Sequence, residues 1–201
     1  ASTSFAGVFA PVFGNDGFKD TNDDDVEDLD AVTYALGVSA SDGVDSGLVD
    51  TLSADKIYLF LESGEVVGRV GLDNDGGADA TGAVAFTIDV NTNSGVVTLE
   101  QSRAIVHDDI NDHNEADDDG TAPNDEPTVD DAAIQQTLAA AAVTLTATVT
   151  DGDGDTATAT ANIGGAFQFL DDGPSVTAEG TIPTLVTDDT EITDSPLSRN
   201  R

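Results

Sequence analysis

The sequence contains no cysteine and only six lysine and arginine residues, against 40 aspartate and glutamate residues, in a chain of 201. The absence of cysteine excludes disulfides and thiolate metal sites. The formal net charge of −34 makes nucleic acid and anionic membranes unsuitable partners, because both are bound by positive surfaces. No run approaches the ~18 consecutive apolar residues of a membrane-spanning helix.

The first residues, ASTSFAGVFAPVFGN, lack a charged leader and a cleavage pattern. We therefore expect no signal peptide here and, for an exported protein, an export signal elsewhere in a longer chain.

Motifs for catalysis are also missing from the sequence. The serines do not stand in a G-x-S-x-G context, and the glycine-rich stretch DNDGGADATG has no phosphate-loop lysine. Acidic pairs are so numerous that no single pair stands out as an acid–base dyad. We expect a protein that is not an enzyme, and an enzyme acting on polysaccharide is the least favoured alternative.

Alternation of apolar and polar residues predicts β-strands along most of the chain. Two such runs, 143–150 (VTLTATVT) and 156–163 (TATATANI), flank an Asp-Gly turn. They predict a hairpin whose threonine face is solvated and whose Val/Ala face is buried. Further strands are expected at 31–39, 56–63, 65–72, 82–90, 95–106 and 166–172, and a short helix at 130–140 with Asp130 as its cap. This pattern predicts an all-β fold, a single antiparallel β-sandwich-like domain with at most one or two short helices. Its long acidic loops are expected to be calcium-binding loops, for the reasons that follow.

The acidic residues are mostly aspartate, 32 against 8 glutamates, which favours loops that hold a ligand. Asp151, Asp153 and Asp155 alternate with glycine in VTDGDGDTAT. The stretch is not an EF-hand loop, because position six is Thr156, position twelve is Asn162, and strands flank it. Alternating carboxylates on a tight turn can still converge on calcium, which takes 6–8 oxygens at ~2.3–2.6 Å. The alternative is an ordinary solvated Asp-Gly turn.

Two longer acidic segments, 14–30 and 107–131, are further candidates for calcium loops, and the alternative for each is a disordered acidic loop. The predicted calcium ligands are aspartates of these loops and turns: Asp20, Asp23, Asp25, Asp42, Asp45, Asp108, Asp109, Asp112, Asp117, Asp151, Asp153, Asp155, Asp171 and Asp172. The two histidines of the chain, His107 and His113, leave zinc as a less favoured alternative.

Four stretches resemble a known family: VTYALGVSASDGVDSGLVDT, LESGEVVGRVG, VTLEQSRAIVH and VTLTATVTDGDGDTATATANIGGAFQFLDDGP. They are similar to a large β-rich domain of giant RTX adhesins of bacteria, and the resemblance runs over 5–174. It implies type I secretion through an uncleaved C-terminal signal and a location outside the cell or on its surface, where calcium is millimolar. We expect a calcium-binding adhesin domain at 1–174, and a linker or the start of a following domain at 175–201.

The resemblance also implies a function. Some members of this group bind peptides, notably free C-terminal ends, through a bound calcium, and others are repeated units of a stalk. We expect a calcium-dependent adhesion module with several Ca²⁺ ions that binds a peptide or protein C-terminus and is monomeric as an isolated domain. The alternative is a calcium-rigidified spacer without a ligand. The predicted ligand-binding residues are Arg69, Arg103, His107, Asp108 and Asp109. A guanidinium can hold a carboxylate through two hydrogen bonds, although each arginine can instead neutralise a nearby aspartate.

Overall fold

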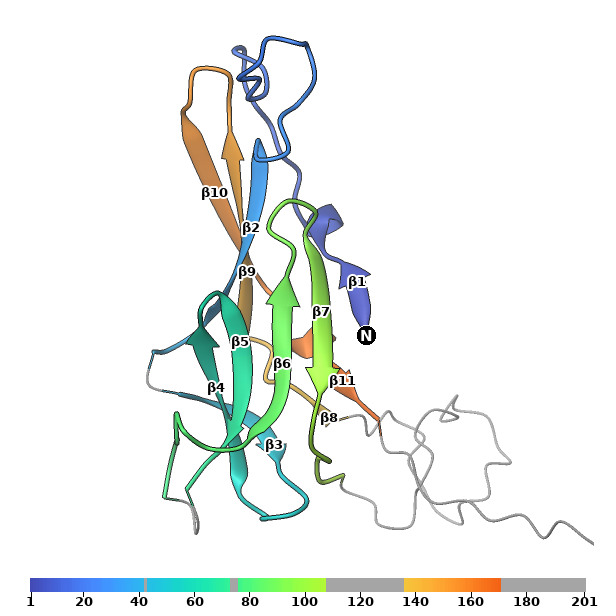
Figure 1. Ribbon diagram of the computed structural model, residues 1–201, viewed down its shortest axis with the longest axis vertical. Helices are drawn as coiled ribbons and strands as arrows, with labels where there is room; N and C mark the ends of the chain where they lie inside the picture. The colour runs from blue at the N-terminus through green and yellow to red at the C-terminus, as the bar shows by residue number, and fades with distance from the viewer. Residues whose placement is uncertain (42, 73–75, 108–135, 171–201) are drawn as a thin grey trace, which may run out of the picture.

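The structure is a computed structural model and describes residues 1–41, 43–72, 76–107 and 136–170 (Figure 1). The described strands are β1 (Ser2–Ser4), β2 (Val32–Val38), β3 (Val44–Val49), β4 (Lys56–Glu62), β5 (Glu65–Val70), β6 (Val84–Val90), β7 (Val96–Gln101), β8 (Gln136–Thr137), β9 (Val143–Thr150), β10 (Thr156–Asn162) and β11 (Gln168–Phe169). Two single-turn 3₁₀ helices, η1 (Ala6–Val8) and η3 (Gly164–Ala166), interrupt them. None of the described helices is long and apolar enough to cross a membrane. The predicted all-β fold is confirmed.

The described strands form antiparallel sheets. One sheet has the order β1-β7-β6-β5-β4-β3 and a second the order β10-β9-β2, while β11 and β8 form a small ribbon. Figure 1 shows that the three-stranded sheet extends well beyond the upper end of the six-stranded sheet. The molecule therefore has two layers in its lower half and a narrow upper half that ends in loops.

The core lies where the two sheets face each other, and alternate residues of each strand point into it. Phe86 and Ile88 of β6 and Leu145 of β9 are fully buried there. The ring of Phe169 in β11 packs on that of Phe86, with the centroids 5.1 Å apart. Because each such side chain contributes about 1.5–3 kcal/mol on burial, this cluster accounts for much of the stability of the lower half.

Two predicted hairpins are present with the turns that their residues favour. Glu62 pairs with Glu65 across Ser63 and Gly64, whose φ angles of 54° and 98° give the mirror-image turn that matches the twist of paired strands. In the second hairpin Thr150 pairs with Thr156, which leaves 151–155 as the turn. This turn carries the three alternating aspartates to the upper end of the molecule.

The helix predicted at 130–140 is wrong over its described part. Gln136–Thr137 forms strand β8 and pairs with β11, and the chain then enters a turn that begins at Ala140. The helix-forming residues are overridden by tertiary packing, because Leu138 is only 1% exposed within the core beside β11. Residues 130–135 lie outside the described part of the chain.

The predicted burial of the Val/Ala face of the β9–β10 hairpin holds for most of β9 and for the lower end of the second run, where Ala161 is half-buried and Ile163 is buried, and it fails for the first two alanines of β10. Leu145 and Ala147 of β9 are buried, whereas Ala157 and Ala159 of β10 are exposed. The reason lies in the architecture. This part of β10 belongs to the narrow upper half, beyond the reach of the six-stranded sheet (Figure 1).

Candidate metal centre

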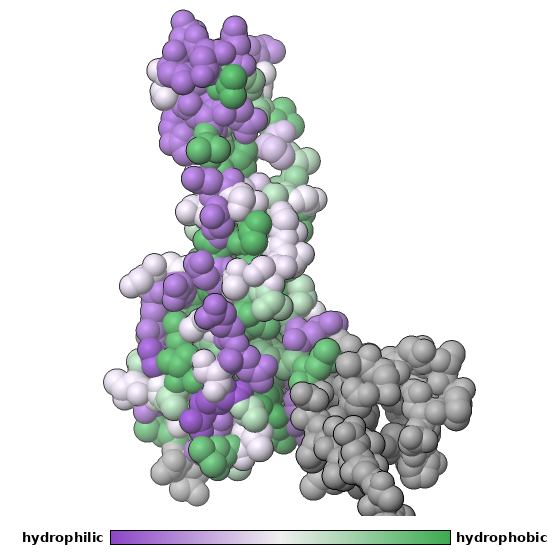
Figure 2. Space-filling model, turned by 45° about the vertical axis from the view of Figure 1, so that its right-hand side comes forward, coloured by the Kyte–Doolittle hydropathy of each residue, from purple (hydrophilic) through white to green (hydrophobic). Residues whose placement is uncertain are grey.

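Two acidic segments far apart in the sequence meet at the upper end of the molecule, here called the tip. The loop 14–30, which precedes β2, lies beside the 151–155 turn between β9 and β10 (Figure 1). Figure 2 shows a hydrophilic surface over this end, in contrast to the mixed surface below it. The tip therefore gathers carboxylates on a support made by β2, β9 and β10.

Backbone hydrogen bonds hold the two segments together. The Gly152 N–H donates to the carbonyl of Gly17 at 3.0 Å, and the Lys19 N–H donates to the carbonyl of Thr150 at 3.3 Å. Phe18 forms an antiparallel bridge with Asp151. Residues 17–19 thus extend the sheet by a short stretch of pairing and place Asp16 next to the aspartate turn.

Asp16, Asp151 and Asp153 form the candidate metal centre. One carboxylate oxygen from each lies within 4.8 Å of the others, with Asp151 half-buried and the other two side chains exposed. Two oxygens on one calcium ion are separated by at most twice the metal–oxygen distance, about 5 Å. The three carboxylates are therefore close enough together to hold a single metal ion.

The electrostatics of the cluster also favour a cation. The pKa of Asp153 is raised, first because its carboxyl shares a hydrogen bond with Asp151, and further by the like charges of Asp151 and Asp155. The described basic side chains have acidic partners elsewhere: Lys19 pairs with Asp30, Lys56 with Asp45, Arg69 with Glu62 and Arg103 with Asp50. A bound divalent ion would remove the repulsion that now favours protonation of Asp153.

Three predicted ligands of the first acidic loop lie at the same place. A hollow of about 450 Å³ at the tip is lined by Asp16, Gly17, Phe18, Asp20, Asp23, Asp25, Gly152 and Asp153. The carboxylate of Asp20 accepts the N–H groups of Asp24 and Asp25 at 3.3 and 2.8 Å. Asp23 and Asp25 take the left-handed conformation, with φ of 58° and 61°. Asp20 thus folds this loop through its own hydrogen bonds.

The far end of this loop is anchored separately. The Asp28 carboxylate accepts both the N–H and the hydroxyl of Thr21, at 3.0 and 2.7 Å, which lowers the pKa of Asp28. The Asp28 N–H donates to the carbonyl of Lys19 at 2.9 Å. These bonds tie both ends of 19–28 together and fix the position of the hollow.

Of the other predicted metal ligands, Asp155 lies in the same turn as the centre and Asp45 lies far from it. Asp155 contributes its N–H to Asp151 Oδ1 at 2.9 Å and so shapes the turn. Asp45 pairs with Lys56 in the lower half of the molecule, at 2.7 Å, and this lowers the pKa of Asp45. The remaining candidates fall outside the described residues: Asp42, Asp108, Asp109, Asp112, Asp117, Asp171 and Asp172, together with His113.

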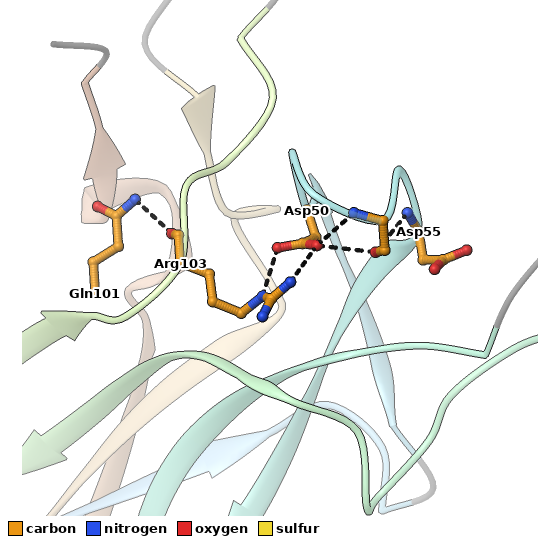
Figure 3. Close-up of polar contacts among 5 residues, drawn as sticks. Asp50, Asp55, Gln101 and Arg103 are labelled. Carbon is orange, nitrogen blue, oxygen red and sulfur yellow. Dashed lines mark hydrogen bonds and ion pairs between the residues drawn. The ribbon is translucent and has the colours of Figure 1, made fainter.

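Both arginines predicted to bind a ligand have a carboxylate partner within the domain. Arg103 donates from Nε and Nη2 to the two oxygens of Asp50, at 2.7 and 2.8 Å, and Asp50 also accepts the N–H and hydroxyl of Ser53 (Figure 3). Arg69 holds Glu62 through two bonds of 2.6 and 2.8 Å. The pair with Asp50 agrees with the alternative that Arg103 neutralises a nearby aspartate, while the partner of Arg69 is a glutamate. Ligand contact by either arginine stays a prediction.

A second hollow lies beside Arg103. It measures about 410 Å³ and is lined by Asp50, Thr51, Leu52, Ser102, Arg103 and Ala104. Leu52 is 83% exposed at its rim. The half-buried His107, the third predicted ligand-binding residue that the structure describes, follows Val106, whose N–H donates to the carbonyl of Val49.

Asp16 and Asp50 are two important residues that sequence reasoning missed. Asp16 stands between Asn15 and Gly17, and Gly17 has a φ of 73°. This short turn signal could have drawn attention to it within the 14–30 segment. Asp50 is one of 32 aspartates in the chain, and no local signal in the sequence distinguishes it.

The close approach of the two segments gives a first testable prediction. A Cβ at Gly152 would lie 2.4 Å from the carbonyl oxygen of Asp16. Gly152→Ala is expected to push the two segments apart and to weaken calcium binding at the tip about tenfold, although all three carboxylates remain. Isothermal titration calorimetry measures the change. Gly7→Ala, where a Cβ meets nothing within 4 Å, is the control. Equal affinities for the Gly152→Ala variant and the wild type would contradict this geometry.

The fold and the tip together define an all-β domain with a candidate carboxylate metal centre. The chain belongs to the DUF5801 family, whose description is "domain of unknown function" and whose family model matches residues 1–164. Searches of curated proteins and of solved structures gave no match.

Proposed function

We propose that this domain is a calcium-dependent ligand-binding module of a secreted bacterial adhesin. The observation that carries the proposal is the convergence of Asp16, Asp151 and Asp153 at the tip, where one carboxylate oxygen of each lies within 4.8 Å of the others. In this proposal calcium joins the 14–30 loop to the β9–β10 turn. The domain then reaches its binding-competent form only where calcium is abundant, as it is outside a cell.

The chemistry of the donors supports calcium over other metals. Carboxylate oxygens are hard ligands, whereas zinc and the later transition metals favour imidazole or thiolate. Magnesium requires a near-ideal octahedron, while calcium accepts irregular sets of 6–8 oxygens. Asp20, Asp23 and Asp25 line the same hollow and are available as additional or outer ligands.

The ligand of the proposed module is a peptide or protein C-terminus, bound in the hollow beside Arg103. That hollow combines a guanidinium with the exposed apolar side chain of Leu52. It also lies close along the chain to His107, Asp108 and Asp109, which are proposed to hold a second calcium ion. A terminal carboxylate would bind that ion, and the neighbouring side chain of the peptide would contact Leu52.

The proposal is tested with two sets of otherwise identical peptides, one with free and one with amidated C-termini, in calcium and in chelator. We expect capture of the free peptides only, and only in calcium. Leu52→Asp is expected to abolish capture. Leu29→Asp, at a leucine that is 82% exposed on the tip loop, is the matched control and is expected to retain capture. Equal capture of both peptide sets, or no capture of either, would contradict the proposal.

The spacer remains the second candidate function, and the elongated shape of the domain favours it (Figure 1). In a spacer, calcium at the tip stiffens one end of a rod, and no peptide is retained under any condition. The peptide experiment therefore separates the two functions.

A further inference from the structure

In the part of the chain that the structure describes, the outer edge of β10 is an open strand edge. β10 pairs with β9 on one side, and among the described residues no strand pairs with it on the other. Its residues from Thr156 to Thr160 are all exposed. An unpaired edge is a template for another strand, because its N–H and C=O groups lack partners.

The hydrogen-bond register identifies the groups that face outward. The Asp151 N–H donates to the Asp155 carbonyl at 3.0 Å and the Ile163 N–H to the Val143 carbonyl at 2.9 Å. Hydrogen-bonded pairs recur at every second position, so the alanines of β10 face β9 with their backbone groups. The backbone groups of the intervening residues face away from β9: Thr156, Thr158, Thr160 and Asn162.

The side chains agree with this register. The hydroxyls of Thr146 and Thr160 are 2.9 Å apart. Side chains approach closely at pairs that do not exchange backbone hydrogen bonds. The outward direction of the Thr160 backbone groups is thus supported by an independent contact.

The residues of β10 itself are not those by which proteins protect such an edge. Its sequence, TATATAN, contains no charge, no proline and no bulge-forming glycine. Its alanine face borders an apolar groove of about 360 Å³, lined by Val8, Phe9, Ala10, Pro11, Val12, Ala147, Val149, Ala157, Thr158 and Ala159. A strand added to this edge would place every second side chain over the same groove.

The negative charge of the tip indicates which kind of strand can bind at the edge of β10. β10 begins directly after the aspartate turn, so the tip carboxylates of Asp151, Asp153 and Asp155 lie at one end of the open edge. A calcium ion at the tip would offset only two of the negative charges there. A second copy of this chain would bring another 34 negative charges, which disfavours self-pairing.

We propose that the open edge of β10 binds an extended segment of a partner protein by strand addition. The segment has small or β-branched apolar residues on the groove side and a lysine or arginine against the acidic tip. Antiparallel pairing is the more stable arrangement, and it places the basic residue at the C-terminal end of the segment.

The probe is the peptide TVTVTVK, amidated at its C-terminus and labelled at its amino end, with binding measured by fluorescence polarisation in calcium buffer. We expect saturable binding, and about tenfold weaker binding when lysine is replaced by glutamate. Because the peptide has no free carboxylate, the result does not depend on the proposed C-terminus site.

Thr158→Pro tests the edge itself. It removes an outward N–H without removing a bond to β9, and it is expected to weaken binding about tenfold. Ser2→Pro, on the edge strand β1 of the other sheet, is the control and is expected to bind like the wild type. Matching circular dichroism melts show that both variants fold. Equal peptide binding by Thr158→Pro and the wild type would overturn the proposal. A wild type that binds no peptide and instead forms a dimer that Thr158→Pro dissociates would overturn it too.

Discussion

Replacing Asp50 by asparagine is expected to lower the free energy of unfolding by about 3 kcal/mol, because it leaves the half-buried guanidinium of Arg103 without its counter-ion. The Asp50 side chain is 1% exposed, and that of Arg103 is 25% exposed. The two bonds between them join the end of β3 to the segment after β7, across 53 positions of the sequence (Figure 3). Urea denaturation of the variant and the wild type measures the loss.

Asp45→Asn is the matched control for this prediction. Asp45 pairs with Lys56 at a similar distance, 2.7 Å, but the two side chains are 45% and 47% exposed. Exposed ion pairs contribute about 0–1 kcal/mol, so this variant should unfold almost like the wild type. Equal losses for the two variants would show that burial does not determine the contribution of the Asp50–Arg103 pair.

The same ion pair predicts a dependence of stability on pH. The bonds from Arg103, with those from Ser53, lower the pKa of Asp50 from 3.8 to about 2 in the folded protein. A lowered pKa means that the stabilisation is fully present above the pKa of the unfolded chain and is lost as the pH falls through that of the folded protein. The stability difference between wild type and Asp50→Asn should therefore shrink as the pH falls from about 4 to about 2.

Calcium is expected to raise the melting temperature of the domain by about 5–10 °C per occupied site, relative to the protein in chelator. At a free calcium concentration a hundred times the Kd, one site adds about 2.7 kcal/mol to the free energy of unfolding. The melting temperature of a domain of this size rises by about 2–4 °C per kcal/mol. Magnesium at the same concentration should have a much smaller effect, because the irregular carboxylate cluster does not suit its octahedron. A scanning calorimetry series in calcium, magnesium and chelator measures this. Identical melting temperatures in calcium and chelator would contradict the prediction.

The strands with strict alternation could be predicted from the sequence, and those formed by long-range pairing could not. The β9–β10 hairpin follows from its period-two pattern and its Gly/Asp turn. β8 could not be predicted, because its two residues become a strand only by pairing with β11, against the helical preference of their neighbours. The exposure of the β10 alanines likewise depends on where the opposing sheet ends.

In the candidate site, too, the residues marked by local spacing could be predicted from the sequence, and those brought in by long-range pairing could not. The alternating aspartates of 151–155 predict a metal-binding turn by local spacing, and two of them, Asp151 and Asp153, do lie in the acidic cluster that could hold a metal ion. Asp16 completes the cluster only because residues 17–19 pair with the end of β9 and the start of the turn. That pairing joins distant parts of the chain through backbone groups, which carry no signature in the side-chain pattern.

The most direct test of the proposed calcium centre at the tip is a calorimetric calcium titration of the wild type and of the triple variant Asp16→Asn, Asp151→Asn and Asp153→Asn. Calcium ions bound elsewhere in the chain contribute equally to both titrations, so the difference in stoichiometry reports on the tip alone. We expect the triple variant to bind one calcium ion fewer than the wild type and to keep its affinity at any remaining sites. The same stoichiometry and affinities in both proteins would show that these three carboxylates do not form a calcium site.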